Sequence, residues 1–492
     1  MTLKEIVKGI HYKFIQGNIN VEVNDICYDS REIKKKDAFV CLIGIDTNGH
    51  QYIQNAIQKG CNCIIICQEI NEKIDKSITI VKVKDTRTTL SYLSANLFHH
   101  PANNLIKIAI TGTKGKTSTS WMIKNILEQK GEKVGIIGTI GTIIDGKLIP
   151  HKNTTPESYQ IQKYMREMVD KKTKYLVMEV SSQALKVGRV NNIFFDYAIF
   201  TNLSLDHIGP REHPTYEDYQ NSKRKLFTQT KVGILNKDDP AYSIMIQDNA
   251  CSIYTYGSKD CDLQIDKITQ THEKDFLGTT FQLSGKIHDT FQIPAPGNFS
   301  AYNATAAILL SLLLDTKITD IKEGLSQFHV LGRCEIINIG HQNKVIIDFA
   351  HNKISMESII KTMREYHPNR IITLFGCGGG RSRERRKELG TTAGTLSDFS
   401  IITTDNPRND DIDEINQNIV EGIEEVKGKY IIIKDRKEAI YYALKNATQN
   451  DIILLLGKGH ETYQEIKGEK YDFNEKEIIN TFLKEQKNEQ QN

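Results

Sequence analysis

The hydrophobic pattern of the chain is most regular between residues 104 and 330. Short apolar runs alternate there with stretches of helical periodicity, at residues 106–110, 118–130, 133–137, 158–171, 175–180 and 197–200. Strands that alternate with helices predict a parallel sheet wrapped by helices. Ligands bind at the carboxyl ends of the strands in such a sheet, so we expect functional side chains to follow these apolar runs.

The same alternation restarts near residue 331 and predicts a second parallel α/β unit, with strands and helices at residues 344–349, 353–367, 370–376, 401–404, 430–434, 436–445 and 451–456. Residues 1–103 hold shorter strands (38–42, 63–67 and 78–83) and helices near 50–59 and 88–99. We therefore expect three domains, 1–103, 104–330 and 331–492. The polar tail from about residue 484 has no apolar periodicity, and we expect it to be disordered.

Composition narrows the class of protein. The 492 residues are more than one hydrophobic core holds. The 64 basic residues nearly balance the 61 acidic ones, which gives no general attraction to nucleic acid. The first residues lack the apolar core of a signal peptide, and no apolar stretch is long enough to span a bilayer. We expect a cytoplasmic protein that neither binds nucleic acid nor inserts into a membrane.

The nine cysteines of such a chain are expected to be free thiols. Cys61, Cys63 and Cys67 are close enough in sequence to suggest a metal site, but they include neither a CxxC pair nor a histidine partner. The apolar residues between Cys63 and Cys67 are typical of a buried strand, which is the interpretation we favour.

The segment from Lys107 to Thr119 has the residue order of a phosphate-binding loop. A β-prone run leads into a glycine-rich turn and then a helix from Ser118, which directs backbone N–H groups at one point. Lys116 adds a positive charge for the outer phosphates, and Thr117 adds a hydroxyl for Mg²⁺. The spacing is not that of the standard P-loop, because Ile110 stands where that pattern has glycine. The alternative is a glycine-containing turn after a strand.

Two further predicted strand ends and one lysine in a predicted helix are candidates for chemistry. Glu179 closes an apolar run, and a carboxylate is costly to bury there without a cation such as Mg²⁺; a solvated strand end is the alternative. Asp206 and His207 follow another run, where a hydrogen-bonded turn cap is equally compatible. Lys223 lies in an amphipathic helical stretch, and its local pattern is that of a surface lysine.

In the third segment, polar clusters again follow apolar runs, at residues 331–335, 348–351, 376–387, 405–408 and 457–463. One of them contains four arginines, Arg381, Arg383, Arg385 and Arg386. Beside glycine-rich strand ends, guanidinium groups favour the binding of carboxylate or phosphate over that of nucleic acid.

Together these motifs resemble those of the Mur ligase family, the ATP-dependent amino-acid-adding enzymes of peptidoglycan precursor synthesis. The resemblance runs nearly end to end and is greatest to the members that add the third peptide residue. Its motifs include Tyr28-Asp-Ser-Arg31, Thr111-Gly-Thr-Lys-Gly-Lys-Thr117, Asn153-Thr-Thr-Pro156, Met178-Glu-Val-Ser-Ser182, Thr201-Asn-Leu-Ser-Leu-Asp-His207, Asp405-Asn-Pro-Arg408 and Gly457-Lys-Gly-His-Glu461. It implies an α/β fold of three domains: a UDP-substrate-binding domain (1–103), a central ATP-binding domain with a P-loop-type parallel sheet (104–330) and a Rossmann-like amino-acid-binding domain (331–492).

The resemblance also implies a reaction, in which ATP phosphorylates the free carboxylate of a UDP-N-acetylmuramoyl dipeptide and an amine then displaces phosphate from the acyl phosphate. The implied catalytic residues are Lys116, Glu179, His207 and Lys223. Of these, Glu179, His207 and a CO₂-derived carbamate on Lys223 would bind Mg²⁺ together with Thr117. The implied ATP contacts are Thr111, Gly112, Thr113, Lys114, Gly115, Lys116, Thr117, Ser118, Asn303, Arg333 and Asp348. Positions that match dipeptide-binding residues are Ser30, Asn153, Thr154, Thr155, Ser182 and Arg189.

The Asp405-Asn-Pro-Arg408 motif bears on which amino acid is added. In the family this form goes with meso-diaminopimelate, whose distal carboxylate an arginine can bind. The matching pocket residues are Arg386, Asp405, Asn406, Arg408, Gly457 and Glu461, of which Glu461 suits the distal ammonium. The residues after His207 resemble a branch that includes lysine-adding enzymes, so L-lysine or another diamino acid is an alternative.

Other functions remain open on the sequence alone. One is a divergent paralogue outside cell-wall synthesis. Another is folylpolyglutamate synthetase, although the separate first domain and the Asp-Asn-Pro-Arg motif argue against it. A third is an idle nucleotide-binding scaffold. The presence of all the residues expected to bind phosphate and metal argues against it. We expect the active protein to be a monomer.

Overall fold

The computed structural model of the chain describes residues 1–44, 47–70, 72–206, 208–209, 212–248, 250–272, 276–330 and 332–491. The chain forms two compact units. Unit 1 contains Met1–Ile265, Ser284–His288 and Tyr302–Gly324, and unit 2 contains Asp266–Leu283, Asp289–Ala301 and Leu325–Asn492. In the part of the chain that is described, no helix is long and apolar enough to cross a membrane.

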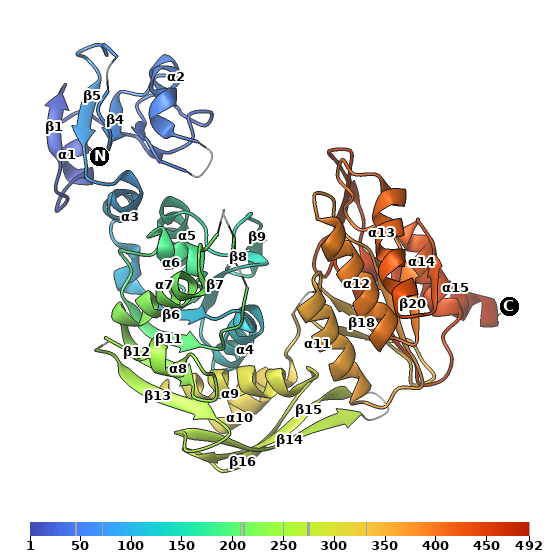
Figure 1. Cartoon of the computed structure of the whole chain (residues 1–492). Coiled ribbons are helices and arrows are strands. Elements are labelled where there is room, and N and C mark those ends of the chain that lie inside the picture. The colour runs from blue at the N-terminus through green and yellow to red at the C-terminus, as the bar shows by residue number, and fades with distance from the viewer. Residues whose placement is uncertain are drawn as a thin grey trace. The chain divides into compact units, whose positions relative to one another are not determined.

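The N-terminal part of unit 1 is a five-stranded sheet in the order β1-β5-β4-β3-β2 (Figure 1). Its strands are β1 (Lys13–Gln16), β2 (Ile26–Cys27), β3 (Ala38–Val40), β4 (Cys63–Ile66) and β5 (Thr79–Lys82). Its helices are α1 (Leu3–Ile6), η1 (Gly49–Tyr52), α2 (Ile53–Gln58), α3 (Thr86–Leu97) and η2 (Pro101–Asn104). Every residue of β4 is buried and all nine cysteines are free, which confirms the predicted strand and the predicted free thiols.

The rest of unit 1 is built on a sheet in the order β13-β12-β11-β6-β10-β7-β8-β9. Its strands are β6 (Ile106–Thr111), β7 (Val134–Gly138), β8 (Gly141–Ile144), β9 (Lys147–Ile149), β10 (Tyr175–Glu179), β11 (Phe195–Phe200), β12 (Thr230–Asn236) and β13 (Ser252–Gly257). The six strands from β13 to β7 are parallel, as predicted, and β8 and β9 add antiparallel pairs. The first residues of β14 (Leu263–His272) pair with β13.

Helices cover the faces of this sheet (Figure 1). They are α4 (Lys116–Gln129), α5 (Ser158–Asp170), α6 (Ser182–Lys186), α7 (Tyr216–Thr228), α8 (Tyr242–Met245), α9 (Asn298–Leu313) and α10 (Ile318–Ser326). One buried cluster packs the sheet against α5 and α7, through side chains such as Met165, Met178 and Phe227. Because β6, β10 and β11 are parallel neighbours, their carboxyl ends lie at one edge, which is where the candidate site is built.

Unit 2 contains the antiparallel pair β15 (Leu277–Gly285) and β16 (Asp289–Ile293), and a six-stranded sheet in the order β17-β18-β22-β19-β20-β21. The strands of the sheet are β17 (Glu335–Asn338), β18 (Lys344–Asp348), β19 (Ile371–Phe375), β20 (Phe399–Ile402), β21 (Tyr430–Ile432) and β22 (Ile452–Leu456). All of them are parallel except β17, which confirms the predicted second parallel sheet. The remaining elements are α11 (Lys353–Arg364), α12 (Arg383–Leu396), α13 (Ile412–Glu425), α14 (Arg436–Lys445), α15 (Glu475–Gln491), β23 (Tyr463–Ile466) and β24 (Glu469–Asp472).

The expected disorder from about residue 484 needs correction, because α15 continues to Gln491. The buried side chains of Ile479 and Phe482, one turn apart, anchor the helix in the core beside Ile440 and Leu455. The polar residues that follow are mostly good helix formers, so they extend a helix that is already nucleated.

Candidate active site

The phosphate-binding loop is a tight turn between β6 and α4. Gly112 and Gly115 both have positive φ, of 150° and 86°. A Cβ atom on Gly112 would overlap Thr201 Oγ1, and one on Gly115 would overlap Asn303 Oδ1, so neither position tolerates a side chain. The helix begins at Lys116, two residues earlier than predicted, because the left-handed Gly115 is its N-cap. The turn therefore presents the N-terminus of a long helix at the carboxyl edge of the sheet, where a phosphate can bind.

Two lysines converge on one carbonyl of this loop. Lys116 Nζ donates to Gly112 O at 2.8 Å and to Thr113 O at 3.0 Å. Lys223 Nζ reaches the same Gly112 O from α7 at 2.9 Å and lies 4.7 Å above the Tyr219 ring. Lys223 is 2% exposed, so the local interpretation as a surface lysine is wrong. Burial, and then the charge of Lys116, lower the pKa of Lys223 well below its ordinary value.

Glu179 is buried at the end of β10 and is 1% exposed, which excludes a solvated strand end. Its Oε2 accepts hydrogen bonds from Thr117 Oγ1 at 3.0 Å and from Thr139 Oγ1 at 2.8 Å. Its Oε1 accepts one from Thr139 N at 3.1 Å. A carboxylate and hydroxyls beside a phosphate loop form an oxygen donor set that suits a hard cation such as Mg²⁺. Among the described residues, no three His, Cys, Asp or Glu side chains gather at one point. His207, the other predicted ligand, lies outside the described residues.

The predicted dipeptide-binding residues of unit 1 largely gather around Glu179. Thr155 Oγ1 donates to Glu179 O at 2.8 Å, and Arg189 donates to Thr155 O at 2.9 Å. Thr154 Oγ1 is 3.1 Å from Thr139 Oγ1. Of the other predicted residues, Asn153 is exposed in the loop before Thr154, and Ser30 is buried in the loop after β2, in the N-terminal part of unit 1.

The surroundings of Ser182 contain a residue that sequence reasoning missed. Ser182 Oγ is 2.9 Å from His213 Nε2, and His213 Nδ1 is 2.6 Å from Asp218 Oδ2. Burial lowers the pKa of His213, which is 1% exposed. A neutral imidazole that donates Nδ1–H to Asp218 accepts the Ser182 hydroxyl proton at Nε2 and so orients that hydroxyl. No local pattern indicates this contact, because His213 lies 31 residues from Ser182 along the chain.

A second cluster lies in unit 2, at the ends of β20 and β22. Asn406 Nδ2 donates to Glu461 Oε2 at 2.7 Å. A Cβ atom on Gly457 would lie 2.5 Å from Asp405 Oδ2, so the glycine permits the close approach of that carboxylate. Arg408, with a positive φ of 54°, follows in the same loop. The structure thus brings together Asp405, Asn406, Gly457 and Glu461, four of the residues that the family resemblance implies for the amino-acid pocket.

The two predicted pocket arginines differ in how their guanidinium groups are used. Arg408 is half exposed, with Nε 3.5 Å from Glu465 Oε2. Arg386 is buried in α12, where it pairs with Asp410 at 2.5 Å and with Glu414 at 3.4 Å. The Arg408 guanidinium is therefore the more available of the two to an incoming carboxylate.

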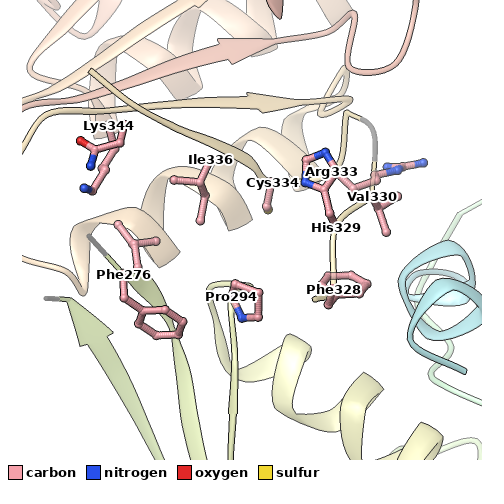
Figure 2. A pocket seen from close by; sticks show the side chains of 11 residues that line it. Phe276, Pro294, Phe328, His329, Val330, Arg333, Cys334, Ile336 and Lys344 are labelled. Atoms are coloured by element: carbon pink, nitrogen blue, oxygen red, sulfur yellow. The ribbon is translucent and has the colours of Figure 1, made fainter. Parts of the chain in front are cut away.

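The remaining predicted ATP contacts are divided between the two units. Asn303 lies beside Gly115 in unit 1. In unit 2, Asp348 accepts hydrogen bonds from the N–H groups of Cys334 and Ala350, both at 2.8 Å. Arg333 lies 5.2 Å from the centroid of the Phe349 ring. Arg333 also lines a cavity of about 200 Å³ in unit 2, together with Phe276, Pro294, Phe328 and Lys344 (Figure 2).

Three family models match the chain in succession. The Mur ligase family, catalytic domain, matches residues 22–97; the Mur ligase middle domain matches residues 110–311; and the Mur ligase, glutamate ligase domain, matches residues 332–459. The first match falls on the N-terminal sheet, the second on the central parallel sheet and on β14, β15 and β16, and the third on the six-stranded sheet.

Curated relatives and a solved structure agree with these models. The chain is 40% identical over 488 residues to the UDP-N-acetylmuramoyl-L-alanyl-D-glutamate–2,6-diaminopimelate ligase of Caldanaerobacter subterraneus subsp. tengcongensis, a match that covers 99% of each chain. It is also 40% identical over 493 residues to the ligase of the same name from Clostridium botulinum, covering 99% of this chain and 100% of the relative. A solved structure of a UDP-N-acetylmuramoyl-L-alanyl-D-glutamate–2,6-diaminopimelate ligase is 26% identical and matches with a TM-score of 0.72 over 99% of both chains.

Proposed function

The chain belongs to the Mur ligase family, with that family's N-terminal, middle and C-terminal α/β domains, and from this premise we propose its reaction. It is a ligase that joins meso-diaminopimelate to UDP-N-acetylmuramoyl-L-alanyl-D-glutamate in peptidoglycan precursor synthesis, with ATP converted to ADP and phosphate. The observation that carries the choice of substrates is the 40% identity to ligases of this name over 99% of the chain.

The domains would divide the work as the sequence suggested. Residues 1–103 would hold the UDP end of the substrate with Ser30, and residues 104–330 would hold ATP. Residues 331–492 would hold the amino acid. We further propose that the enzyme acts as a cytoplasmic monomer.

The chemistry proceeds in two steps. The γ-phosphoryl group of ATP moves to a carboxylate oxygen of the dipeptide: the bond to ADP breaks and an acyl phosphate forms. The amine of diaminopimelate then attacks the acyl carbon, inorganic phosphate leaves from the tetrahedral intermediate, and the nitrogen loses a proton. Both steps depend mainly on positioning and on the neutralisation of phosphate charge. In this scheme the N-terminus of α4 and the Lys116 ammonium bind the phosphates, and Asn303, Arg333 and Asp348 contact the rest of ATP.

The residues present fit a Mg²⁺ ion held by Thr117, Glu179, His207 and a modified Lys223. When bound, the ion would neutralise phosphate charge. An unmodified Lys223 ammonium would repel it. With its lowered pKa, however, the Lys223 amine is available in the neutral form that adds to CO₂. A nitrogen–carbon bond forms and a proton is lost, which leaves an anionic carbamate that presents oxygen to the metal.

The dipeptide would lie along the residues gathered near Glu179. Thr155 and Arg189 are linked to each other and to the end of β10 by hydrogen bonds. The Ser182 hydroxyl, oriented by His213, is a fixed polar group in the helix that follows β10. With Asn153 and Thr154 they form the proposed binding surface for the muramoyl dipeptide.

The amino-acid pocket would use Arg408 for the distal carboxylate and Glu461 for the distal ammonium. Replacing Arg408 with alanine is expected to raise the KM for diaminopimelate roughly 30-fold, because a charge-assisted hydrogen bond contributes about 2 kcal/mol. The KM for ATP should change less than twofold. Steady-state phosphate release measures both constants, and equal increases in the two would contradict the assignment of Arg408.

The proposed function is tested by phosphate release from the pure enzyme with ATP, Mg²⁺ and UDP-N-acetylmuramoyl-L-alanyl-D-glutamate. Meso-diaminopimelate, L-lysine, L-ornithine and no amino acid are compared side by side. The expected result is efficient turnover with meso-diaminopimelate and only weak turnover, at high concentration, with L-lysine or L-ornithine. Turnover with L-lysine or L-ornithine instead would keep the ligase and reject the pocket assignment. No turnover with any of them would indicate a divergent paralogue with another acceptor.

A further inference from the structure

A fully buried lysine, Lys458, lies in the amino-acid pocket and has no part in the scheme above. It follows β22, and its side chain is 0% exposed. Its ammonium is 3.1 Å from Asn406 Oδ1, 3.4 Å from Glu461 Oε2 and 3.9 Å from Asp405 Oδ1. An ammonium group is costly to bury unless polar and charged partners surround it. Lys458 is therefore held in the pocket by the residues proposed to bind the amino acid.

The Lys458 ammonium fixes which way the Asn406 amide points. Asn406 Oδ1 accepts hydrogen bonds from Lys458 Nζ at 3.1 Å and from Glu465 N at 3.0 Å. Because two donors point at this oxygen, the amide nitrogen is turned toward Glu461 Oε2, to which it donates at 2.7 Å. Within the described residues, both side-chain hydrogen bonds of Glu461 go to Oε2, so Oε1 is left for a further cation.

The same ammonium sets the charge of the pocket. Asp405 and Glu461 supply two carboxylates and Lys458 one ammonium, so the ionised cluster carries one net negative charge. That charge matches one ammonium group of a ligand. The rings of Tyr463 and Phe473, 5.8 and 6.0 Å from Lys458 Nζ, surround the cation with aromatic faces rather than with water. Because water is excluded, each charge in the cluster acts strongly on its neighbours.

We propose that Lys458 is a positioning and specificity-determining residue of the amino-acid pocket, an inference that rests on the proposed function. It holds Asn406 and Glu461 in the orientation that accepts the distal ammonium. Its positive charge also balances the negative charge of one of the two carboxylates, so that a substrate with a carboxylate beside its distal ammonium is not repelled. Diaminopimelate has that carboxylate and L-lysine does not. Loss of the Lys458 charge therefore penalises diaminopimelate more than L-lysine.

The test compares Lys458→Met with Lys470→Met. Lys470 is exposed on β24, and its ammonium lies 4.0 Å from the centroid of the same Tyr463 ring, so the control removes a lysine near the pocket but outside the buried cluster. Phosphate release gives kcat/KM for meso-diaminopimelate and for L-lysine, and the KM for ATP. Lys458→Met is expected to lower the ratio of kcat/KM for meso-diaminopimelate to kcat/KM for L-lysine about tenfold or more. The KM for ATP is expected to stay within about twofold of the wild-type value. Lys470→Met is expected to match the wild type.

An unchanged ratio, which includes an equal loss of kcat/KM with both amino acids, would overturn the proposal. A double variant adds a readout that a purely structural role would not move. If Lys458 acts through Glu461, then Lys458→Met and Glu461→Gln have non-additive effects on the ratio, whereas unrelated structural damage adds. Should Lys458→Met fail to fold, Lys458→Gln, which keeps a hydrogen-bond donor without the charge, takes its place in the same comparison. Turnover by the wild type tests the proposed function separately. The effect of Lys458 is judged only from how the ratio of kcat/KM values in each variant differs from that of the wild type.

Discussion

The Lys223→Ala variant is expected to lose ligase turnover by roughly a thousandfold or more while it remains folded. In the proposed site, the carbamate on Lys223 replaces a buried positive charge with an anionic oxygen donor beside the ATP phosphates. Alanine removes that donor and leaves the Lys116 charge without its neighbour. Phosphate release with the full set of substrates measures the loss, and thermal unfolding shows whether the variant is folded.

Two further measurements separate the carbamate from an unmodified lysine. A short carboxylic acid such as acetate or propionate should partly restore turnover to Lys223→Ala, because it supplies the missing oxygens in the space that alanine leaves. In the wild type, ¹³C-labelled bicarbonate should give a carbamate resonance that is absent from the variant. Lys225→Ala, on the exposed side of α7, is the matched control and should behave as the wild type. Full activity in Lys223→Ala would refute the assignment.

Much of the fold could be predicted because its signals are local. The apolar runs before Thr111, Glu179 and Asp348 are strands in the structure, and the residues that follow them lie at the carboxyl edges of parallel sheets. The glycine-rich turn was recognisable because Gly112 and Gly115 occupy backbone conformations that other residues rarely adopt. The β8–β9 hairpin was not predicted, because its strands are short and its turn, Asp145-Gly146, is a single local signal.

The parts of the site that could not be predicted from the sequence depend on contacts between distant segments. Lys223 has the local pattern of a surface residue, yet it is buried and donates to the loop carbonyl of Gly112, 111 residues away. Lys458 meets Asn406 across 52 residues, and His213 meets Ser182 across 31. The periodicity of apolar residues indicates which face of a helix is buried. It does not indicate which polar residue of a distant segment will lie beside a given side chain in the fold. Such partners follow from the order of the strands in the sheet, which a single sequence leaves open.

Lys116→Ala is the second variant expected to lose turnover by roughly a thousandfold, because one ammonium that neutralises the transferring phosphoryl group disappears. Its stability should move in the other direction. In enzyme prepared without CO₂, Lys223 carries no carbamate, and the Lys116 and Lys223 amino groups share Gly112 O, at 2.8 and 2.9 Å, so a charge on one opposes a charge on the other when no phosphate lies between them. Removing Lys116 relieves that opposition, and the variant without ligand or CO₂ is expected to unfold at a temperature equal to or above that of the wild type in the same state.

This opposition distinguishes a functional lysine from a structural one. If Lys116 held the loop together through its hydrogen bonds to Gly112 O and Thr113 O, its replacement would lower the stability and the activity of the enzyme together. Lys124→Ala, which breaks a surface ion pair with Glu128 on the same helix, is the control and should retain turnover. The expected pattern for Lys116→Ala is therefore lost turnover, undiminished thermal stability and a smaller stabilisation by ATP than in the wild type. A clear fall in the unfolding temperature without ligand would show that Lys116 serves the fold of the loop, and the phosphate-binding role would then lack its physical basis.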